Sequence, residues 1–146
     1  MGFFDKIFSR HWGVHPEDHK RPAADAPVLK LPVAPRLFIP LSQHVGAPAR
    51  PRVLVGQTVL KGECIAEAQG NISAPIHASV SGKVVAIGEI TAPHPSGLPM
   101  VAITIESDGE ERWVEPKIIA DPFALTPQEL AATVAAAGVV GLGGAT

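Results

Sequence analysis

The sequence has one cysteine, few aromatic residues and no run of like charge. Cys64 cannot form an internal disulfide, and one thiol cannot hold an iron–sulfur cluster, which takes four ligands that are usually cysteines. The formal net charge is -2, and lysine and arginine are scattered. The chain therefore lacks the basic patch that neutralises the phosphates of nucleic acid, and nucleic acid is not expected as a partner.

Long hydrophobic runs are also missing. The first ten residues carry charges within their apolar stretch and form no h-region, so they are not a secretory signal. We therefore expect a cytoplasmic chain. The longest uncharged stretch, residues 130–146, is interrupted by glycines and is too short to span a membrane as a helix.

Glycine and proline are plentiful instead, with 14 and 15 of the 146 residues, which favours one loop-rich β domain over a helical bundle. Short apolar segments predict strands over residues 37–39, 52–55, 64–67, 83–87 and 100–106, separated by glycine turns. In the last segment Val101, Ile103 and Ile105 are expected on one face. Strands this short and closely spaced are typical of a small sandwich or barrel.

Residues 1–36 are predicted to be an N-terminal arm outside the core. Prolines dominate residues 21–36, which should run extended over the surface. Near the start, four apolar side chains fall on one face of a two-turn helix: Phe3, Phe4, Ile7 and Phe8. The favoured interpretation is a terminus that packs on the domain or frays, and the alternative is a contact with a membrane or another subunit.

One helix is predicted near the C-terminus, over about 127–137. Thr126 and Glu129 have the spacing of a capping box, and Pro127 stands at the first helical position. The helix should end at Gly138, which readily adopts the left-handed conformation of a C-terminal cap. The glycines that follow, at 141, 143 and 144, have no Cβ and could bring backbone amides close to a phosphate or a flavin ring.

Histidine spacing gives a weak signal of metal binding. His11, His15 and His19 are four residues apart, as helical ligands would be. Pro16 interrupts a helix there, because its ring clashes with the carbonyl four residues earlier. Surface or capping roles are therefore favoured for these histidines.

Acid–base and nucleophilic catalysis are not favoured either. No serine and carboxylate near His44 or His77 in the sequence complete a catalytic triad. Glu63 and Glu67 are interpreted as solvent-facing rather than as a catalytic pair. The acidic stretch 106–111 is interpreted as a hairpin tip.

Two half-repeats resemble a known fold. Residues 53–67 have the pattern strand, glycine turn, Lys-Gly turn, strand, and residues 73–87 have an extended entry, a Ser-Gly turn and a strand. This pair resembles the barrel-sandwich hybrid of lipoyl and biotinyl carrier domains. Carriers present a lysine at the tip between the halves, whereas the tip here reads AQGNIS over 68–73. A carrier that lacks its lysine stays an alternative, but carrier activity is disfavoured.

Several motifs together resemble one family over nearly the whole chain. Residues 12–20, 39–48, the barrel, 94–99 and 140–145 occur in this order in the C subunit of the Rnf-type ion-translocating electron-transport complex. The resemblance implies a membrane-associated oxidoreductase and translocase that transfers electrons between NADH and ferredoxin. The C subunit would be its peripheral, NADH-facing member at the cytoplasmic face of the inner membrane, with FMN, NADH and two 4Fe-4S clusters in the full-length polypeptide.

By the same resemblance, this chain corresponds to the N-terminal structural and docking domain. Residues 37–107 are expected to form the barrel, and residues 108–146 the connector, the helix and the start of a nucleotide- and flavin-binding domain. Gly141, Gly143 and Gly144 match the opening of that domain's glycine loop, but the Phe-Pro-Thr stretch that follows in the family is absent. We therefore expect no cofactor and no catalysis in this chain alone, and other subunits as its partners. A free-standing nucleotide- or flavin-binding protein is the alternative.

Overall fold

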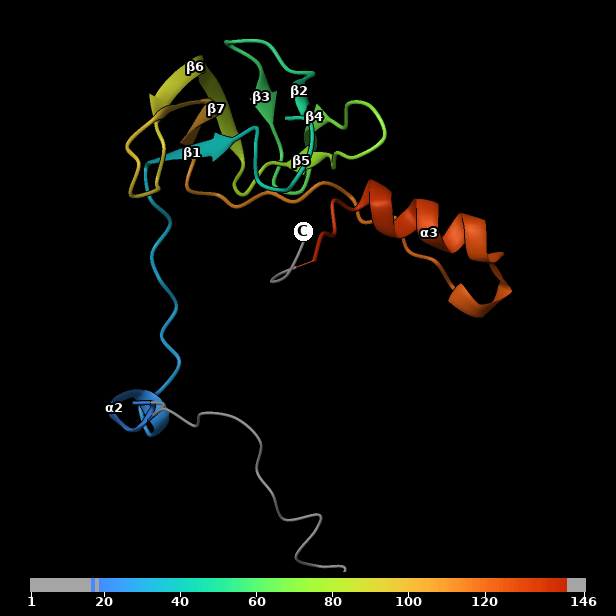
Figure 1. Ribbon diagram of the computed structural model, residues 1–146, viewed down its shortest axis with the longest axis horizontal. Coiled ribbons are helices and arrows are strands. Elements are labelled where there is room, and N and C mark those ends of the chain that lie inside the picture. The colour runs from blue at the N-terminus through green and yellow to red at the C-terminus, as the bar shows by residue number, and fades with distance from the viewer. Residues whose placement is uncertain (1–16, 18, 142–146) are drawn as a thin grey trace, which may run out of the picture. The chain divides into compact units, whose positions relative to one another are not determined.

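The computed structural model describes residue 17 and residues 19–141, and the chain divides into two compact units, Met1–Leu31 and Pro32–Thr146. The described part of the first unit contains one helical turn, α2 (Arg21–Ala24), with a proline in that turn, where a missing N–H costs little. This turn interrupts the stretch that the sequence predicts to be extended. The strands belong to the second unit (Figure 1).

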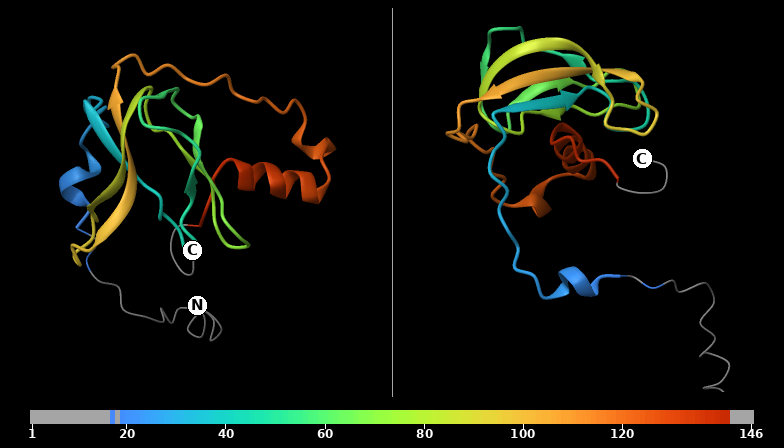
Figure 2. Two further views of the ribbon diagram at one scale, coloured as in Figure 1. Left: turned by 90° about the horizontal axis from the view of Figure 1, so that it is seen from above. Right: turned by 90° about the vertical axis from the view of Figure 1, so that its left-hand side faces the viewer.

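In the described part of the chain, the strands form two antiparallel sheets that face each other (Figure 2). The larger sheet has the order β1-β7-β6-β3, with β1 (Arg36–Pro40), β7 (Pro99–Ser107), β6 (Gly82–Thr91) and β3 (Thr58–Val59). The smaller sheet has the order β2-β4-β5, with β2 (Arg50–Pro51), β4 (Cys64–Glu67) and β5 (Ile76–His77).

The core lies between the two sheets. Ile65 of β4 and Ile103 and Ile105 of β7 are fully buried, and each such side chain contributes about 1.5–3 kcal/mol of hydrophobic free energy. Of the three residues predicted to share one face of this strand, Ile103 and Ile105 are buried in the core, whereas Val101, near the start of β7, is 43% exposed.

Four of the five strands predicted from the sequence are present in the structure. β4 has the predicted bounds, and β6 and β7 extend the predicted strands at both ends. The strand predicted over 52–55 is wrong, because the paired residues are Arg50 and Pro51 and the chain then enters a turn at Gly56, where φ is +94°. The two-residue strands β3 and β5 are not predicted, since two residues show no periodicity.

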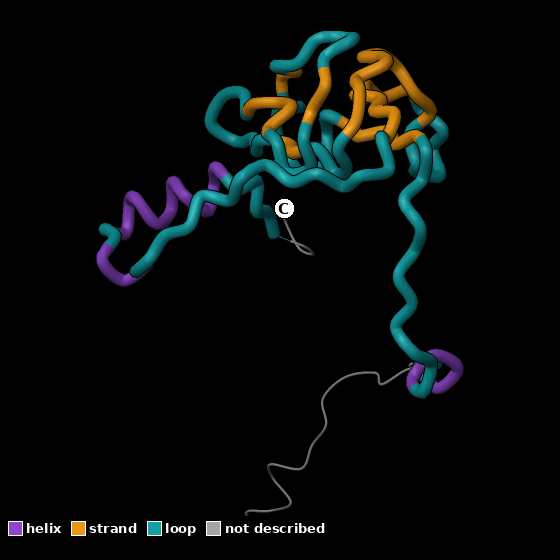
Figure 3. Tube along the Cα trace, turned by 180° about the vertical axis from the view of Figure 1, so that it is seen from behind, coloured by secondary structure: helices purple, strands orange, loops and turns teal. Residues whose placement is uncertain are grey.

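The C-terminal helix α3 (Pro127–Ala136) has the predicted position and cap (Figure 3). The Thr126 hydroxyl accepts from the Glu129 amide at 3.3 Å, and the Glu129 carboxylate accepts from the Thr126 amide at 2.8 Å. That amide, with the Thr126 hydroxyl, holds the pKa of Glu129 below its usual range. A 3-10 turn, η1 (Pro122–Ala124), precedes the helix. No residue of α3 is buried, so the helix adds nothing to the core of the barrel.

The connector after β7 is fastened to the barrel by a polar cluster. The buried Ser81 hydroxyl donates to the Asp108 carboxylate at 2.7 Å and accepts from the Arg112 amide at 2.8 Å. The Arg112 guanidinium donates to the same carboxylate at 2.6 Å, and this bond, with those from the Glu110 amide and Ser81, lowers the pKa of Asp108 to about 2.

This cluster redirects the chain, so the hairpin predicted at residues 106–111 is wrong. A turn does form at Gly109, but the chain then pairs in parallel with Lys61 through Trp113 instead of returning along β7. Lys61 also forms an ion pair with Glu111, and its ammonium lies 4.9 Å from the centroid of the Trp113 ring. The connector therefore starts from a fixed point on the barrel.

Candidate functional site

Residues 68–75 join β4 to β5 and are here called the tip hairpin. Carrier domains hold their lysine at the corresponding tip between the two half-repeats. The tip hairpin lies against the clasp loop, residues 41–49, which joins β1 to β2. Four hydrogen bonds link the two. Gln69 Nε2 donates to the Pro48 carbonyl at 2.7 Å, and the Ala47 amide donates to the Ile72 carbonyl at 3.0 Å. The Ser73 hydroxyl donates to the Ala47 carbonyl at 2.8 Å, and the Ala74 amide donates to His44 Nε2 at 2.8 Å.

His44 is a structural acceptor in this arrangement. Because its Nε2 accepts the Ala74 amide, the proton of the neutral ring belongs on Nδ1. Ser73 Oγ stands 3.3 Å from Nε2, but its own proton points to the Ala47 carbonyl, so the histidine does not activate the hydroxyl as a nucleophile. Sequence reasoning does not bring His44 to the tip hairpin, because the two lie thirty residues apart.

Gly46 allows the clasp loop to approach the tip closely. Its φ is +107°, and a Cβ built there would lie 2.2 Å from the Ile72 carbonyl oxygen. No side chain fits at that distance, and an L-residue rarely adopts that φ. Glycine is therefore required at this position for the contact.

The segment Gly138–Gly141, here called the glycine segment, returns from α3 to the same end of the barrel. Gly138 has a φ of +70°, and a Cβ there would lie 2.6 Å from the Pro75 carbonyl oxygen and 3.3 Å from His77 Nδ1. Val140 and Gly141 line a groove of about 360 Å³ together with the clasp loop and the tip hairpin. Of the three predicted loop glycines, the structure thus places Gly141 beside the tip, whereas Gly143 and Gly144 lie outside the described residues.

The two carboxylates considered as an acid–base pair have separate partners. Glu63 accepts from the Leu60 amide at 2.9 Å and so closes a turn. Glu67 forms an ion pair with Arg50 across β2 and β4, and the hydrogen bond from Arg50 lowers the pKa of Glu67. Each carboxylate thus has a structural partner of its own: Glu63 is partly buried in its turn, and the Glu67 side chain is 44% exposed.

Metal ligands do not gather in the described part of the chain, where no group of three His, Cys, Asp or Glu side chains could hold an ion. Of the three spaced histidines, His19 is exposed with a φ of +48°, and His11 and His15 lie outside the described residues. The apolar N-terminal residues Phe3, Phe4, Ile7 and Phe8 lie outside them too. No helix in residues 19–141 is long and apolar enough to cross a bilayer.

A comparison with protein families decides the relationship. The family model described as the RnfC barrel sandwich hybrid domain matches residues 8–110. The chain belongs to the RnfC family. The barrel-sandwich fold predicted from the half-repeats, and the resemblance to the Rnf-type C subunit predicted from the order of the motifs, are both confirmed. The RnfC barrel accounts for the two facing sheets, and the glycine segment lies beyond the matched region.

Curated RnfC relatives match along most of the chain. The C subunit of the ion-translocating oxidoreductase complex of Rhodobacter capsulatus is 48% identical over 139 residues, which are 95% of this chain and 27% of the relative. Its counterpart in Pseudomonas aeruginosa is 52% identical over 127 residues, 87% of this chain and 16% of the relative. The C subunit of the proton-translocating ferredoxin:NAD(+) oxidoreductase complex of Clostridium ljungdahlii is 44% identical over 135 residues, 92% of this chain and 29% of the relative. The chain thus spans less than a third of the length of these relatives.

Proposed function

We propose that this chain is the N-terminal docking domain of an RnfC-type subunit. The barrel holds the first residues of a nucleotide- and flavin-binding domain at its tip, within a complex that transfers electrons between NADH and ferredoxin and translocates ions. The proposal rests on the close packing of Gly138 against the Pro75 carbonyl and His77, because this contact brings the glycine segment onto the barrel. The electron-transfer activity belongs to the whole complex, and this chain has a positioning role.

The structure of the tip hairpin favours a fixed docking role over the role of a mobile carrier arm. A carrier has to move its prosthetic group between active sites, and it needs a lysine for the attachment. Here the tip has no lysine, and four hydrogen bonds hold it to the clasp loop. A rigid hairpin of this kind can orient a neighbouring domain.

The exposure of the helix α3 favours a domain boundary after the barrel. A ten-residue helix is marginal in water by itself, and none of the residues of α3 is buried. Its apolar side chains, among them the half-exposed Leu130 and Val134, need a cover that the barrel does not supply. We therefore assign residues 1–36 to the arm, 37–107 to the barrel, and 108–146 to the connector, the helix and the start of the next domain.

The proposal places the cofactors outside the barrel. Gly141, Gly143 and Gly144 would contribute the opening of the loop that approaches FMN or NADH, and the remaining residues for FMN, NADH and two 4Fe-4S clusters would come from the longer part that the relatives possess. The subunit would lie peripherally at the cytoplasmic face of the inner membrane. Phe3, Phe4, Ile7 and Phe8 would contact a neighbouring subunit or the lipid surface.

The test uses a full-length RnfC subunit that contains this sequence. Gly138→Ala places a methyl group 2.6 Å from a backbone oxygen, so the glycine segment has to leave its seat. The matched control is Gly109→Ala, which has nearly the same φ, +76°, and nothing within 4 Å. We expect Gly138→Ala to lower the FMN content and the NADH-oxidation rate, and the control to preserve both. Equal flavin content in the two variants would refute the docking role.

A second measurement separates this proposal from the free-standing nucleotide-binding alternative. The 146-residue chain is titrated with NADH and with FMN, and its melting temperature is followed, because a ligand of the native state must raise it. The docking proposal expects no shift with either ligand. Stoichiometric binding to the chain alone would favour the alternative.

A further inference from the structure

Strand β1 leaves one side of its backbone open. It is the outermost strand of its sheet, and in the part of the chain that the structure describes no strand pairs with its outer side. The Ser107 amide donates to the Pro35 carbonyl at 2.9 Å, and the Leu41 amide donates to the Val101 carbonyl at 3.0 Å. In an antiparallel ladder, the residues between these two positions alternate, so Leu37 and Ile39 face β7. The N–H and C=O groups of Arg36 and Phe38 therefore point away from the sheet.

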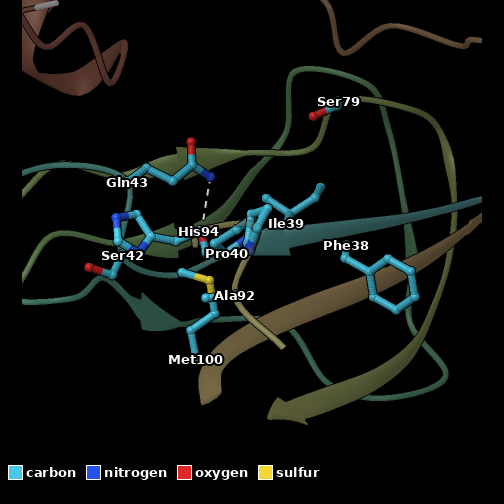
Figure 4. A pocket seen from close by; sticks show the side chains of 10 residues that line it. Phe38, Ile39, Pro40, Ser42, Gln43, Ser79, Ala92, His94 and Met100 are labelled. Atoms are coloured by element: carbon cyan, nitrogen blue, oxygen red, sulfur yellow. Dashed lines mark hydrogen bonds between the residues drawn. The ribbon is translucent and has the colours of Figure 1, made fainter. Parts of the chain in front are cut away.

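A cavity of about 520 Å³ adjoins this open edge. Figure 4 shows Ser79 across the gap from Phe38 and Ile39, with His94 beside Pro40 and Met100 below them. None of its ten lining residues is Asp, Glu, Lys or Arg. The cavity therefore offers a charged ligand group no ionic partner, and it favours an uncharged occupant.

The open edge is short because the chain closes its far end. Pro40 has no N–H to offer, and its carbonyl accepts from Gln43 Nε2 at 2.9 Å, the dashed bond in Figure 4. An added strand can therefore pair with Arg36 and Phe38 and has to stop before Pro40. Prolines on edge strands commonly limit unwanted strand pairing, and here Pro40 leaves only Arg36 and Phe38 available to pair.

The glycine segment runs beside this site without filling it. Gly138 and Val140 line a neighbouring cavity of about 260 Å³, which shares Ile39, Gln43 and Ser79 with the larger one. The two cavities are therefore adjacent, and the glycine segment lies only beside the smaller one.

We propose that the β1 edge and the adjoining cavity bind an extended, uncharged segment of another polypeptide by β-strand addition. The segment makes main-chain hydrogen bonds to Phe38 and Arg36 and places one apolar side chain in the cavity, against Met100. A polypeptide is the fitting partner, because an extended backbone presents donors and acceptors at the spacing of β1, and the cavity beside them selects the side chain. This inference does not depend on the proposed function.

The test is a titration of the ¹⁵N-labelled chain with the uncharged peptide acetyl-Thr-Val-Thr-Val-Thr-amide, followed by amide shifts and hydrogen exchange. We expect shifts at Arg36 and Phe38 and slower exchange of the Phe38 amide. The Leu37 and Ile39 amides, already paired with β7, should exchange slowly with and without peptide.

Two variants separate backbone from side chain. Phe38→Pro removes the outward N–H and leaves every β1–β7 hydrogen bond possible, so we expect binding to weaken about tenfold through the loss of one hydrogen bond. Phe38→Ala keeps the N–H and should retain the protection of the residue 38 amide on peptide binding. Slow exchange at Leu37 and Ile39 shows that β1 is still folded in each variant. A double variant, Pro40→Ala with Gln43→Ala, lengthens the open edge and should bind the peptide more tightly.

The proposal is overturned if millimolar peptide leaves the Phe38 amide unchanged, or if Phe38→Pro binds as the unaltered chain does. It is also overturned if the Phe38 amide shifts with chain concentration in the absence of peptide, because a second copy is then the occupant.

Discussion

The contact between Gly46 and the tip hairpin leads to a quantitative prediction for Gly46→Ala. Alanine at a φ of +107° costs about 1–3 kcal/mol in backbone strain. The new Cβ, 2.2 Å from the Ile72 carbonyl oxygen, also forces the tip away and breaks the hydrogen bond from Ala47, which adds about 1–2 kcal/mol.

Gly56→Ala is the matched control, because Gly56 has a φ of +94° and nothing within 4 Å. It carries the strain without the collision. We expect the melting temperature of Gly46→Ala to lie roughly 10 °C below that of the control, measured by circular dichroism. The Ala47 amide should exchange quickly in Gly46→Ala and slowly in the control. Equal melting temperatures, or a slowly exchanging Ala47 amide in both, would refute the claim that the tip and the clasp loop hold each other.

Three further predictions concern the cap of α3 and the connector. Thr126→Ala removes the acceptor of the Glu129 amide and should destabilise α3 by about 1 kcal/mol, seen as faster amide exchange in 128–136 with an unchanged barrel melting temperature. Ser81→Ala leaves the Arg112 amide without its acceptor and should cost about 1–3 kcal/mol in urea unfolding, whereas a loss below the error of that assay would contradict the role of the buried hydroxyl. Asp108 has a pKa lowered to about 2 from 3.8, so its contribution is present above pH 4 and is lost as the pH falls towards 2. Asp108→Asn should therefore lower the melting temperature at pH 7, and the difference from the unaltered chain should vanish near pH 2; a constant difference would argue against the ion pair as its source.

The sequence predicts α3 fully because every signal for it is local. Thr126, Pro127, Glu129 and Gly138 stand within one short segment, and each acts on its own helix end. β7 is predicted because Val101, Ile103 and Ile105 recur at every second residue, and β4 is predicted because a short apolar segment stands between two glycine turns.

The remaining elements depend on partners that are distant in the sequence. β3 and β5 exist because Val59 and Ile76 are buried and because β6 and β4 pair with them, and a two-residue segment contains no record of that. The site has the same origin. The bond from Ala74 to His44 and the seat of Gly138 on Pro75 join segments that local patterns treat as unrelated. The glycine run and the tip can therefore be recognised in the sequence, but their proximity can be seen only in the folded structure.

The attachment of the connector at Lys61 and of Gly138 at Pro75 means that residues 115–137 are held at both ends. Under the proposed domain division, a domain that includes this segment would be attached to the barrel at two points rather than one. Such an attachment permits rotation about the line that joins the two points and opposes free swinging, because swinging requires one attachment to break. If that domain carries a cofactor, as proposed, the distance from the cofactor to a partner on the barrel would depend mainly on this rotation.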